Sequence, residues 1–206
     1  MVVAGLTGGI ASGKTAVSDA LGRLGAVIID ADLLAREVVR PGTDGLAAVV
    51  QRFGTSMLTA DGELDRAALG AMVFAEPGAR ADLESIIHPR VRARAAELTA
   101  RAAVDVVVVQ VIPLLVETGQ AGAFDCCVVV DVDPETQLRR LINRSGWSEA
   151  EARSRIDAQA SRDERLAAAT WVIDNSGAPD ALDDQVARLS QHLTSNHQPH
   201  PPSAIG

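Results

Sequence analysis

Residues 8–15 read Gly8-Gly9-Ile10-Ala11-Ser12-Gly13-Lys14-Thr15, and this octet is the strongest indication of fold and function in the chain. It matches the phosphate-binding loop pattern G-x-x-x-x-G-K-[ST]. Gly8 and Gly13 allow backbone conformations that a Cβ would disfavour, so the loop amides can point inward and bind phosphate oxygens at a helix N-terminus. Lys14 can reach the β- and γ-phosphates, and the Thr15 hydroxyl can coordinate Mg²⁺. The loop therefore predicts that the chain binds a nucleoside triphosphate.

Lys14 is the only lysine of the 206-residue chain. A composition that otherwise avoids lysine but keeps one in this loop favours a functional role over surface solvation. The flanking sequence fits, because residues 2–7 form an apolar run typical of a strand and residues 14–24 have the pattern of an amphipathic helix, which Gly25 would end. A dinucleotide-binding fingerprint does not fit, since no G-x-G-x-x-G can be read across residues 5–13.

Further apolar runs predict four more strands. They occupy residues 26–29, 106–112, 126–132 and 171–173. The runs lack the polar alternation of a strand with one solvent-exposed face, which is typical of parallel strands covered by helices on both faces. Helical patterns between them complete a βαβ series, so the sequence predicts an α/β fold with a parallel sheet.

Two long intervals interrupt this series. Residues 31–103 have helical periodicity and no good strand, and they are too long for a simple crossover, so we expect a helical insertion that receives a second substrate. Residues 139–168 are helical, rich in arginine and interrupted at Ser145-Gly146-Trp147, which predicts a mobile lid. The predicted domain, residues 1–195, keeps its core in residues 1–30, 104–138 and 169–195, and the proline-rich residues 196–206 are expected to be a disordered tail or a linker stub.

The composition and the apolar runs argue against nucleic acid and a membrane as partners. A formal net charge of −8 and an aromatic content of 2% leave neither clustered cations nor stacking platforms for nucleic acid. No charged segment precedes the first strand, so no signal peptide is expected. The longest apolar run, residues 106–116, is broken by Gln110 and Pro113 and is too short to cross a membrane.

Cys126 and Cys127 are adjacent within one of the apolar runs. They have no spacing typical of a metal or redox site, so we expect two buried thiols in a strand. Free thiols favour a reducing, cytoplasmic location.

Asp30-Ala31-Asp32 follows the second predicted strand, at the edge of the sheet where α/β folds place ligands. One of the two carboxylates could accept the proton of an attacking hydroxyl, and Asp32 is the candidate base. The alternative is that Asp30 caps a helix that begins at Ala31, with Asp32 favoured there by the helix dipole. As a cap, Asp30 could still contact Mg²⁺ through water.

Arg140 and Arg144 lie four residues apart on one helix face, with Arg139 beside them. Guanidinium groups bind phosphate oxygens in pairs and can stabilise charge on a transferring group. The alternative is a solvated helix face paired with Glu149 or Glu151. The local excess of positive charge in an acidic chain favours a lid that faces phosphate, and it continues through Arg153, Arg155, Arg162 and Arg165.

His88-Pro89-Arg90 lies inside the predicted helical insertion. Pro89 disfavours the helical conformation at His88, so the sequence predicts a break between two helices there. The alternative is a helix-ending turn without a functional role. A metal-binding aspartate is common at the end of the third strand, but this chain has Gln110-Val111-Ile112-Pro113 there. Metal binding would therefore depend on Thr15, the nucleotide phosphates, water and one of the two aspartates at positions 30 and 32.

With these motifs in hand, the chain resembles the bacterial dephospho-CoA kinases from residue 2 to about residue 193. Each later motif is weak alone, but their order and spacing are specific. The motifs are residues 5–15, Asp30-Ala31-Asp32 with Ala35-Arg36, His88-Pro89-Arg90, Pro113-Leu114-Leu115-Val116-Glu117, residues 139–144, Gln159 and Ile173-Asp174-Asn175-Ser176-Gly177.

The resemblance implies a three-layer P-loop kinase of the nucleoside-monophosphate-kinase type, with a five-stranded parallel sheet, a helical CoA-binding insertion and a lid. It implies that Asp32 is the base for a ribose 3′-hydroxyl, that Lys14 and Arg140 hold the transferring phosphoryl group, and that Thr15 serves Mg²⁺. The further ATP-binding residues implied are Gly9, Ala11, Ser12, Gly13, Ala16, Arg144, Asn175 and Gly177. The further acceptor-binding residues implied are His88, Arg90, Leu114 and Glu117.

Three functions are therefore compared. The first is phosphorylation of dephospho-CoA by ATP to give CoA and ADP, with these small molecules as partners and the oligomeric state left open. The second is a kinase for a nucleoside monophosphate or small metabolite, which the motifs of the insertion disfavour. The third is a GTP-binding switch or a CoA sensor; a guanine-reading N-K-x-D motif needs a second lysine, which the chain lacks.

Overall fold

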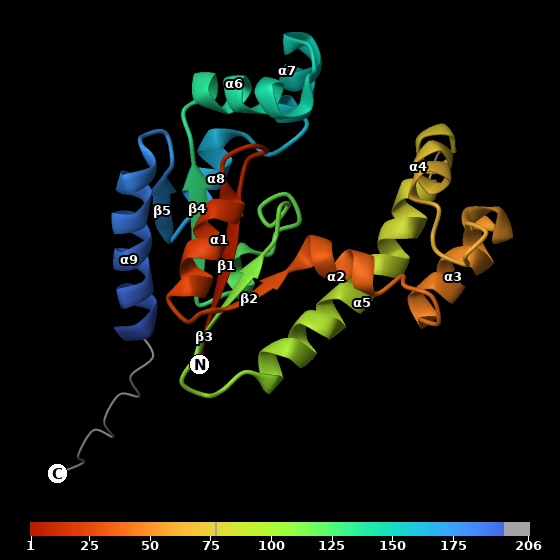
Figure 1. Ribbon diagram of the computed structural model, residues 1–206, viewed down its shortest axis with the longest axis horizontal. Coiled ribbons are helices and arrows are strands. Elements are labelled where there is room, and N and C mark those ends of the chain that lie inside the picture. The colour runs from red at the N-terminus through yellow and green to blue at the C-terminus, as the bar shows by residue number, and fades with distance from the viewer. Residues whose placement is uncertain (77, 196–206) are drawn as a thin grey trace. The chain divides into compact units, whose positions relative to one another are not determined.

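The computed structural model describes residues 1–76 and 78–195 (Figure 1). The predicted tail, residues 196–206, lies outside the described residues. The described chain divides into two compact units: a sheet unit of residues 1–29 and 102–195, and a helical unit, Asp30–Arg101.

A five-stranded parallel sheet forms the centre of the sheet unit, so the predicted α/β fold is confirmed. Its strand order is β2-β3-β1-β4-β5, which places β1 between β3 and β4. The strands are β1 (Val2–Gly8), β2 (Val27–Asp30), β3 (Val107–Val111), β4 (Cys126–Asp131) and β5 (Trp171–Asp174). Each predicted strand agrees with these bounds to within one residue at either end.

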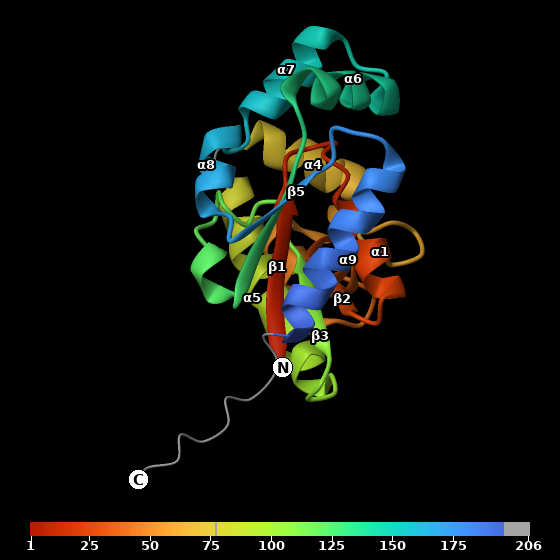
Figure 2. The same cartoon turned by 90° about the vertical axis from the view of Figure 1, so that its left-hand side faces the viewer.

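Helices cover both faces of this sheet. On one face α1 and α9 pack side by side (Figure 2), and on the other α8 packs against β4. The helices of the sheet unit are α1 (Lys14–Arg23), α6 (Pro134–Ser145), α7 (Glu149–Asp157), α8 (Arg162–Ala168), α9 (Pro179–Ser195) and the short η2 (Ala121–Ala123). Helix α1 ends where predicted, because Gly25 has φ 95° and its amide donates to Gly22 O over 3.0 Å.

The burial of β4 explains why the strands are unbroken apolar runs in the sequence. Cys126, Val128 and Val130 belong to the core cluster shared with Leu6. Cys127 and Val129 belong instead to the cluster around Leu115. Alternate residues of one strand are therefore buried on opposite faces of the sheet.

The two cysteines are buried free thiols, as predicted. Burial raises the pKa of both the Cys126 and the Cys127 thiol, so both remain protonated at neutral pH.

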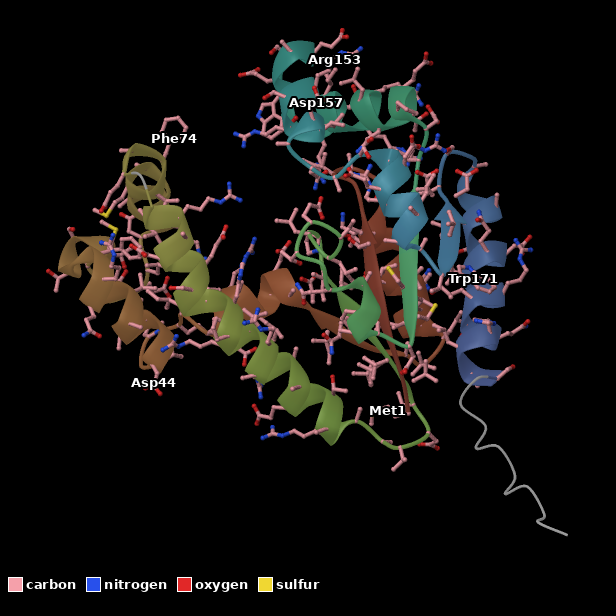
Figure 3. The ribbon with its side chains drawn as sticks, turned by 180° about the vertical axis from the view of Figure 1, so that it is seen from behind. Met1, Asp44, Phe74, Arg153, Asp157 and Trp171 are labelled. Carbon is pink, nitrogen blue, oxygen red and sulfur yellow. The ribbon has the colours of Figure 1, made fainter. Side chains whose placement is uncertain are left out.

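The helical unit has its own apolar core, which includes Val49, Phe53 and Met57. Helices α2, α3 and α4 each contact the long helix α5. Their bounds are α2 (Ala31–Glu37), α3 (Asp44–Phe53), α4 (Arg66–Ala75) and α5 (Ala79–Arg101), with the short η1 (Thr55–Met57) and one β-bridge between Leu58 and Leu64. Phe74 projects from α4 and is 95% exposed (Figure 3). Over the described ranges, no helix has both the length and the apolar character needed to cross a bilayer.

The predicted break at His88-Pro89 is wrong, and so is the alternative of a helix-ending turn. Helix α5 continues through Pro89 (Figure 1). The Arg90 guanidinium donates to Ile86 O over 2.7 Å, a contact within the same helix. Ile86 and Ile87 pack against the core of the unit. The bias that a proline imposes on its preceding residue is local, and tertiary packing along α5 outweighs it here.

We expect Pro89→Ala to stabilise the protein, because Pro89 is an exposed residue inside a helix, where proline lacks an amide donor. The gain should be about 1–2 kcal/mol after allowing for the greater entropy of the unfolded chain. Urea unfolding followed by circular dichroism measures it. Pro41→Ala is the matched control, because Pro41 is an exposed turn residue and its replacement should not stabilise. A lower free energy of unfolding for Pro89→Ala would contradict the expectation.

Candidate phosphate-binding site

Residues 8–15 connect β1 to α1 at the carboxyl end of the central strand. The Ser12 amide donates to Gly9 O over 3.1 Å and closes a tight turn. Gly13 has φ 95°, and Ala11 has φ 60°. Ala11 is the one non-glycine residue with positive φ among the described residues. A left-handed alanine is held against its own preference, so its surroundings must fix this conformation.

The glycines of the loop are also required by their neighbours. A Cβ on Gly8 would overlap with Val130 O of β4, and one on Gly13 would overlap with the Asn175 carboxamide. Gly9 has no positive φ; a Cβ there would lie 2.5 Å from Nε2 of Gln137. Sequence reasoning predicted conformational freedom at Gly8 and Gly13, but close approach by a backbone carbonyl of β4 and by side chains of α6 and of the segment after β5 is an equal constraint.

Lys14 is the first residue of α1, and its ammonium lies on the loop itself. Nζ donates to Gly8 O over 2.8 Å and to Gly9 O over 3.2 Å. Thr15 and Ala16 follow in the first turn of α1 and are exposed. Ser12 is buried, and its Oγ has no hydrogen-bond partner within the described part of the chain.

Three carboxamides hold the backbone of the loop from outside. Gln159 Oε1 accepts from the Ile10 amide over 2.7 Å, and Gln137 Nε2 donates to Ile10 O over 2.9 Å. Asn175 Nδ2 donates to Ser12 O over 2.8 Å. Sequence reasoning gave Gln137 no role, because its contact with Ile10 joins residues 127 positions apart in the chain.

Three arginines of residues 139–168 lie on α6, and the others described below lie on α7 and α8. Arg139 donates to Thr136 Oγ1 over 2.9 Å, and Arg140 and Arg144 lie further along α6. The alternative pairing of Arg140 and Arg144 with Glu149 or Glu151 is not observed. Glu149 pairs with Arg153 at 2.7 Å, and Glu151 belongs to the capping box of Ser148.

The other arginines of residues 139–168 have different contacts, and the expected phosphate-facing lid stays a prediction. Arg153 is paired within α7, and the Arg155 guanidinium lies 5.5 Å from the centre of the Trp147 ring. Arg162 binds both carboxylate oxygens of Asp131, at 2.7 to 3.1 Å, and this bonding raises the pKa of Arg162. Arg165 is only 7% exposed, and burial lowers its pKa. The sequence could not distinguish these partners, because spacing along a helix does not say which element packs against it.

Leu114 and Glu117 lie in the segment after β3. Leu114 is 39% exposed. Glu117 Oε1 accepts from the Ala160 amide over 3.0 Å, so this carboxylate contacts the connection between α7 and α8. Where an aspartate is common at the end of the third strand, Pro113 O accepts from Thr7 Oγ1 over 3.3 Å.

Three of the remaining candidates, Asp30, Asp32 and His88, belong to the helical unit. Asp30 is the N-cap of α2, because its Oδ1 accepts from the amides of Asp32 and Leu33 at 2.7 and 3.2 Å, and this alternative is confirmed. Asp32 is an exposed residue in the first turn of α2. His88 is an exposed residue of α5. Gly177, in the sheet unit, is exposed two residues after Asn175.

Comparison with known proteins identifies the family of the chain. The family model for dephospho-CoA kinase matches residues 2–180. A dephospho-CoA kinase of Streptomyces avermitilis is 51% identical over 202 residues, which are 98% of each chain. One of Cutibacterium acnes is 55% identical over 192 residues, covering 92% of this chain and 83% of the relative. One of Mycolicibacterium paratuberculosis is 54% identical over 182 residues, covering 88% of this chain but only 45% of the relative, so the chain spans about half of that protein.

Solved structures give the same result. The dephospho-CoA kinase of Campylobacter jejuni has a TM-score of 0.74 at 25% identity, covering 95% of this chain and 98% of the other. A shikimate kinase of Acinetobacter baumannii has a TM-score of 0.55 at 18% identity, covering 95% and 94%, and shares the fold alone. Because the family model spans nearly the whole described chain and full-length relatives are about half identical, the chain belongs to the dephospho-CoA kinase family.

Proposed function

We propose that the protein transfers the γ-phosphoryl group of ATP to the ribose 3′-hydroxyl of dephospho-CoA, giving CoA and ADP in the last step of CoA biosynthesis. The observation that carries this proposal is a phosphate-binding loop with Lys14 in a chain of the dephospho-CoA kinase family. Phosphoryl transfer needs in-line positioning and stabilisation of charge, and little covalent chemistry from the protein. A rigid loop with one ammonium group meets the first of these needs for the donor.

On the donor side, Gly9 and residues 11–16 would bind the triphosphate. Lys14 would move from the Gly8 and Gly9 carbonyls to the phosphate oxygens, because an anion is the stronger partner for an ammonium group. Arg140 and Arg144 would reach the transferring group from α6, as part of a lid of residues 139–168. Asn175 and Gly177 would lie near the adenine.

On the acceptor side, Asp32 would take the proton of the 3′-hydroxyl. Asp30 is a poorer candidate, because one of its oxygens already accepts two backbone hydrogen bonds as the cap of α2. His88, Arg90, Leu114 and Glu117 would line the acceptor site, with residues 31–103 as the insertion that binds it.

Mg²⁺ fits the residues of the loop. The Thr15 side chain is exposed in the first turn of α1, beside the amides that would hold the phosphates. Magnesium sites commonly combine one or two protein oxygens with phosphate oxygens and water, so a hydroxyl with ATP is a sufficient donor set. The chemistry that the ion supplies there is neutralisation of charge on the β- and γ-phosphate oxygens.

ADP release with Mg·ATP and a panel of acceptors tests the substrate. We expect turnover of dephospho-CoA to exceed that of AMP, CMP and shikimate by several orders of magnitude, since only the first fills a site for the CoA body. The second candidate function is a kinase for a nucleoside monophosphate or small metabolite. A shikimate kinase shares the fold, so the fold alone does not separate the two candidates. Preferred turnover of any of those three acceptors would reject the proposal.

Lys14→Ala should lower the rate of phosphoryl transfer by about 10²–10³, because it removes a preorganised donor worth about 3–4 kcal/mol at the transition state. The readout is kcat/KM for both substrates, with circular dichroism to check folding. A variant with wild-type kcat/KM would remove Lys14 from the mechanism.

Asp32→Asn should lower kcat by about 10²–10⁴, the range for loss of a general base. Asp30→Asn is the matched control, because asparagine caps helices about as well as aspartate and should leave kcat within a few-fold of wild type. The proton-acceptor role would pass to Asp30 if the two variants gave the opposite order.

A further inference from the structure

Ile10 stands at the tip of the phosphate loop with both of its backbone polar atoms bound by side chains. Its N–H donates to Gln159 Oε1 over 2.7 Å, and its carbonyl accepts from Gln137 Nε2 over 2.9 Å. The next residue is Ala11, with φ 60°. An L-residue holds that conformation only when its neighbours fix the chain on either side. The two glutamines hold Ile10 on one side of Ala11, and Asn175 Nδ2 donates to Ser12 O on the other side.

The orientation of each carboxamide follows from its partner. An amide N–H can only donate, so Gln159 must present its oxygen to Ile10. A carbonyl can only accept, so Gln137 must present its nitrogen. Gln137 is only 5% exposed, and Gly9 leaves room for it, since a Cβ on Gly9 would lie 2.5 Å from Nε2.

Gln159 is held in place by the segment that carries it. The next residue, Ala160, donates its amide to Glu117 Oε1 over 3.0 Å, and its carbonyl accepts from the buried Arg165. Ser161 caps α8, and Arg162 forms its two-pronged ion pair with Asp131 of β4.

The residues that return from α7 to α8 are therefore tied to the sheet unit at several points. The Asp131 side chain of the ion pair is only 9% exposed, so that pair is well shielded from water on one side. Because the segment that carries it is constrained, Gln159 can hold the Ile10 amide in one position.

We infer that Gln159 is a positioning residue for the nucleotide, which acts through the Ile10 amide to hold the phosphate loop in its ligand-binding conformation. The expected effects on KM and kcat rest on the proposed function, whereas the expected effect on nucleotide binding does not. Gln159 makes its contact with the loop at the Ile10 amide, whereas Lys14 Nζ contacts the Gly8 and Gly9 carbonyls. Removal of Gln159 should therefore weaken ATP binding equally in the ground and transition states, which raises KM for ATP and leaves kcat nearly unchanged.

Gln159→Met tests this, because methionine has a similar length and no acceptor for the Ile10 amide. The dissociation constant of a non-hydrolysable ATP analogue with Mg²⁺, measured by calorimetry, should rise about three- to tenfold, the range for loss of one hydrogen bond. KM for ATP should rise by the same factor, while kcat and KM for dephospho-CoA stay within twofold. Gln137→Met should shift the dissociation constant in the same direction and provides the test if Gln159→Met does not fold.

Gln185→Met is the matched control. Gln185 is another glutamine whose carboxamide binds the backbone: it accepts from the Asp174 amide over 2.9 Å and donates to Asp174 O over 2.7 Å, but it contacts no residue of the loop by these bonds. It should lose stability to a similar degree and keep the wild-type dissociation constant.

The inference is overturned if Gln159→Met binds the analogue as wild type does, or if it lowers Tm and kcat without changing the dissociation constant. It is also overturned if Gln185→Met weakens binding to the same extent. Failure of the proposed function looks different: wild-type protein would bind the analogue but would not phosphorylate dephospho-CoA.

Discussion

The close approach of neighbouring groups to residues 8–15 is the constraint on which the site depends. Val130 O, Gln137 and Asn175 occupy the space that a Cβ on Gly8, Gly9 or Gly13 would need. The loop is therefore shaped from outside by β4, α6 and the segment after β5, as well as from inside by its own positive φ angles. Lys14 adds a third set of contacts, because its ammonium lies on two carbonyls of the loop. A preformed cradle of this kind reduces the ordering that a triphosphate would otherwise have to impose.

The sheet makes these approaches possible. With the order β2-β3-β1-β4-β5, strand β1 lies between β3 and β4; the connection from β1 to β2 runs in one direction across the sheet, and the connection from β3 to β4 runs in the other. Ligands of open α/β sheets bind at the carboxyl ends of strands at such a point. The register pairs Gly8 with Val130, so the end of β1 and the end of β4 meet where the loop begins. Burial of alternate β4 residues on opposite faces fixes that register, because a shift by one residue would exchange the two apolar clusters.

The sequence was sufficient for features that depend on local chemistry. The strands were predicted to within one residue because short apolar runs without polar alternation are typical of buried parallel strands. The Asp30 cap followed from a short polar residue before a helix. Pro89 was misjudged because its local bias is weaker than the packing of α5 against three helices. Gln137, Ala11 and the partners of Arg162 and Arg165 depend on contacts between segments far apart in the chain. The lengths and types of those side chains were readable, but the sequence did not indicate which surfaces they would meet.

The arrangement of Lys14 gives the most direct test of the whole account. The measurement is a crystal structure of the protein with Mg²⁺ and a non-hydrolysable ATP analogue. The account predicts that the triphosphate lies inside residues 8–15 and that Lys14 Nζ has exchanged the Gly8 and Gly9 carbonyls for phosphate oxygens. A triphosphate bound elsewhere, with Nζ still on those two carbonyls, would contradict it.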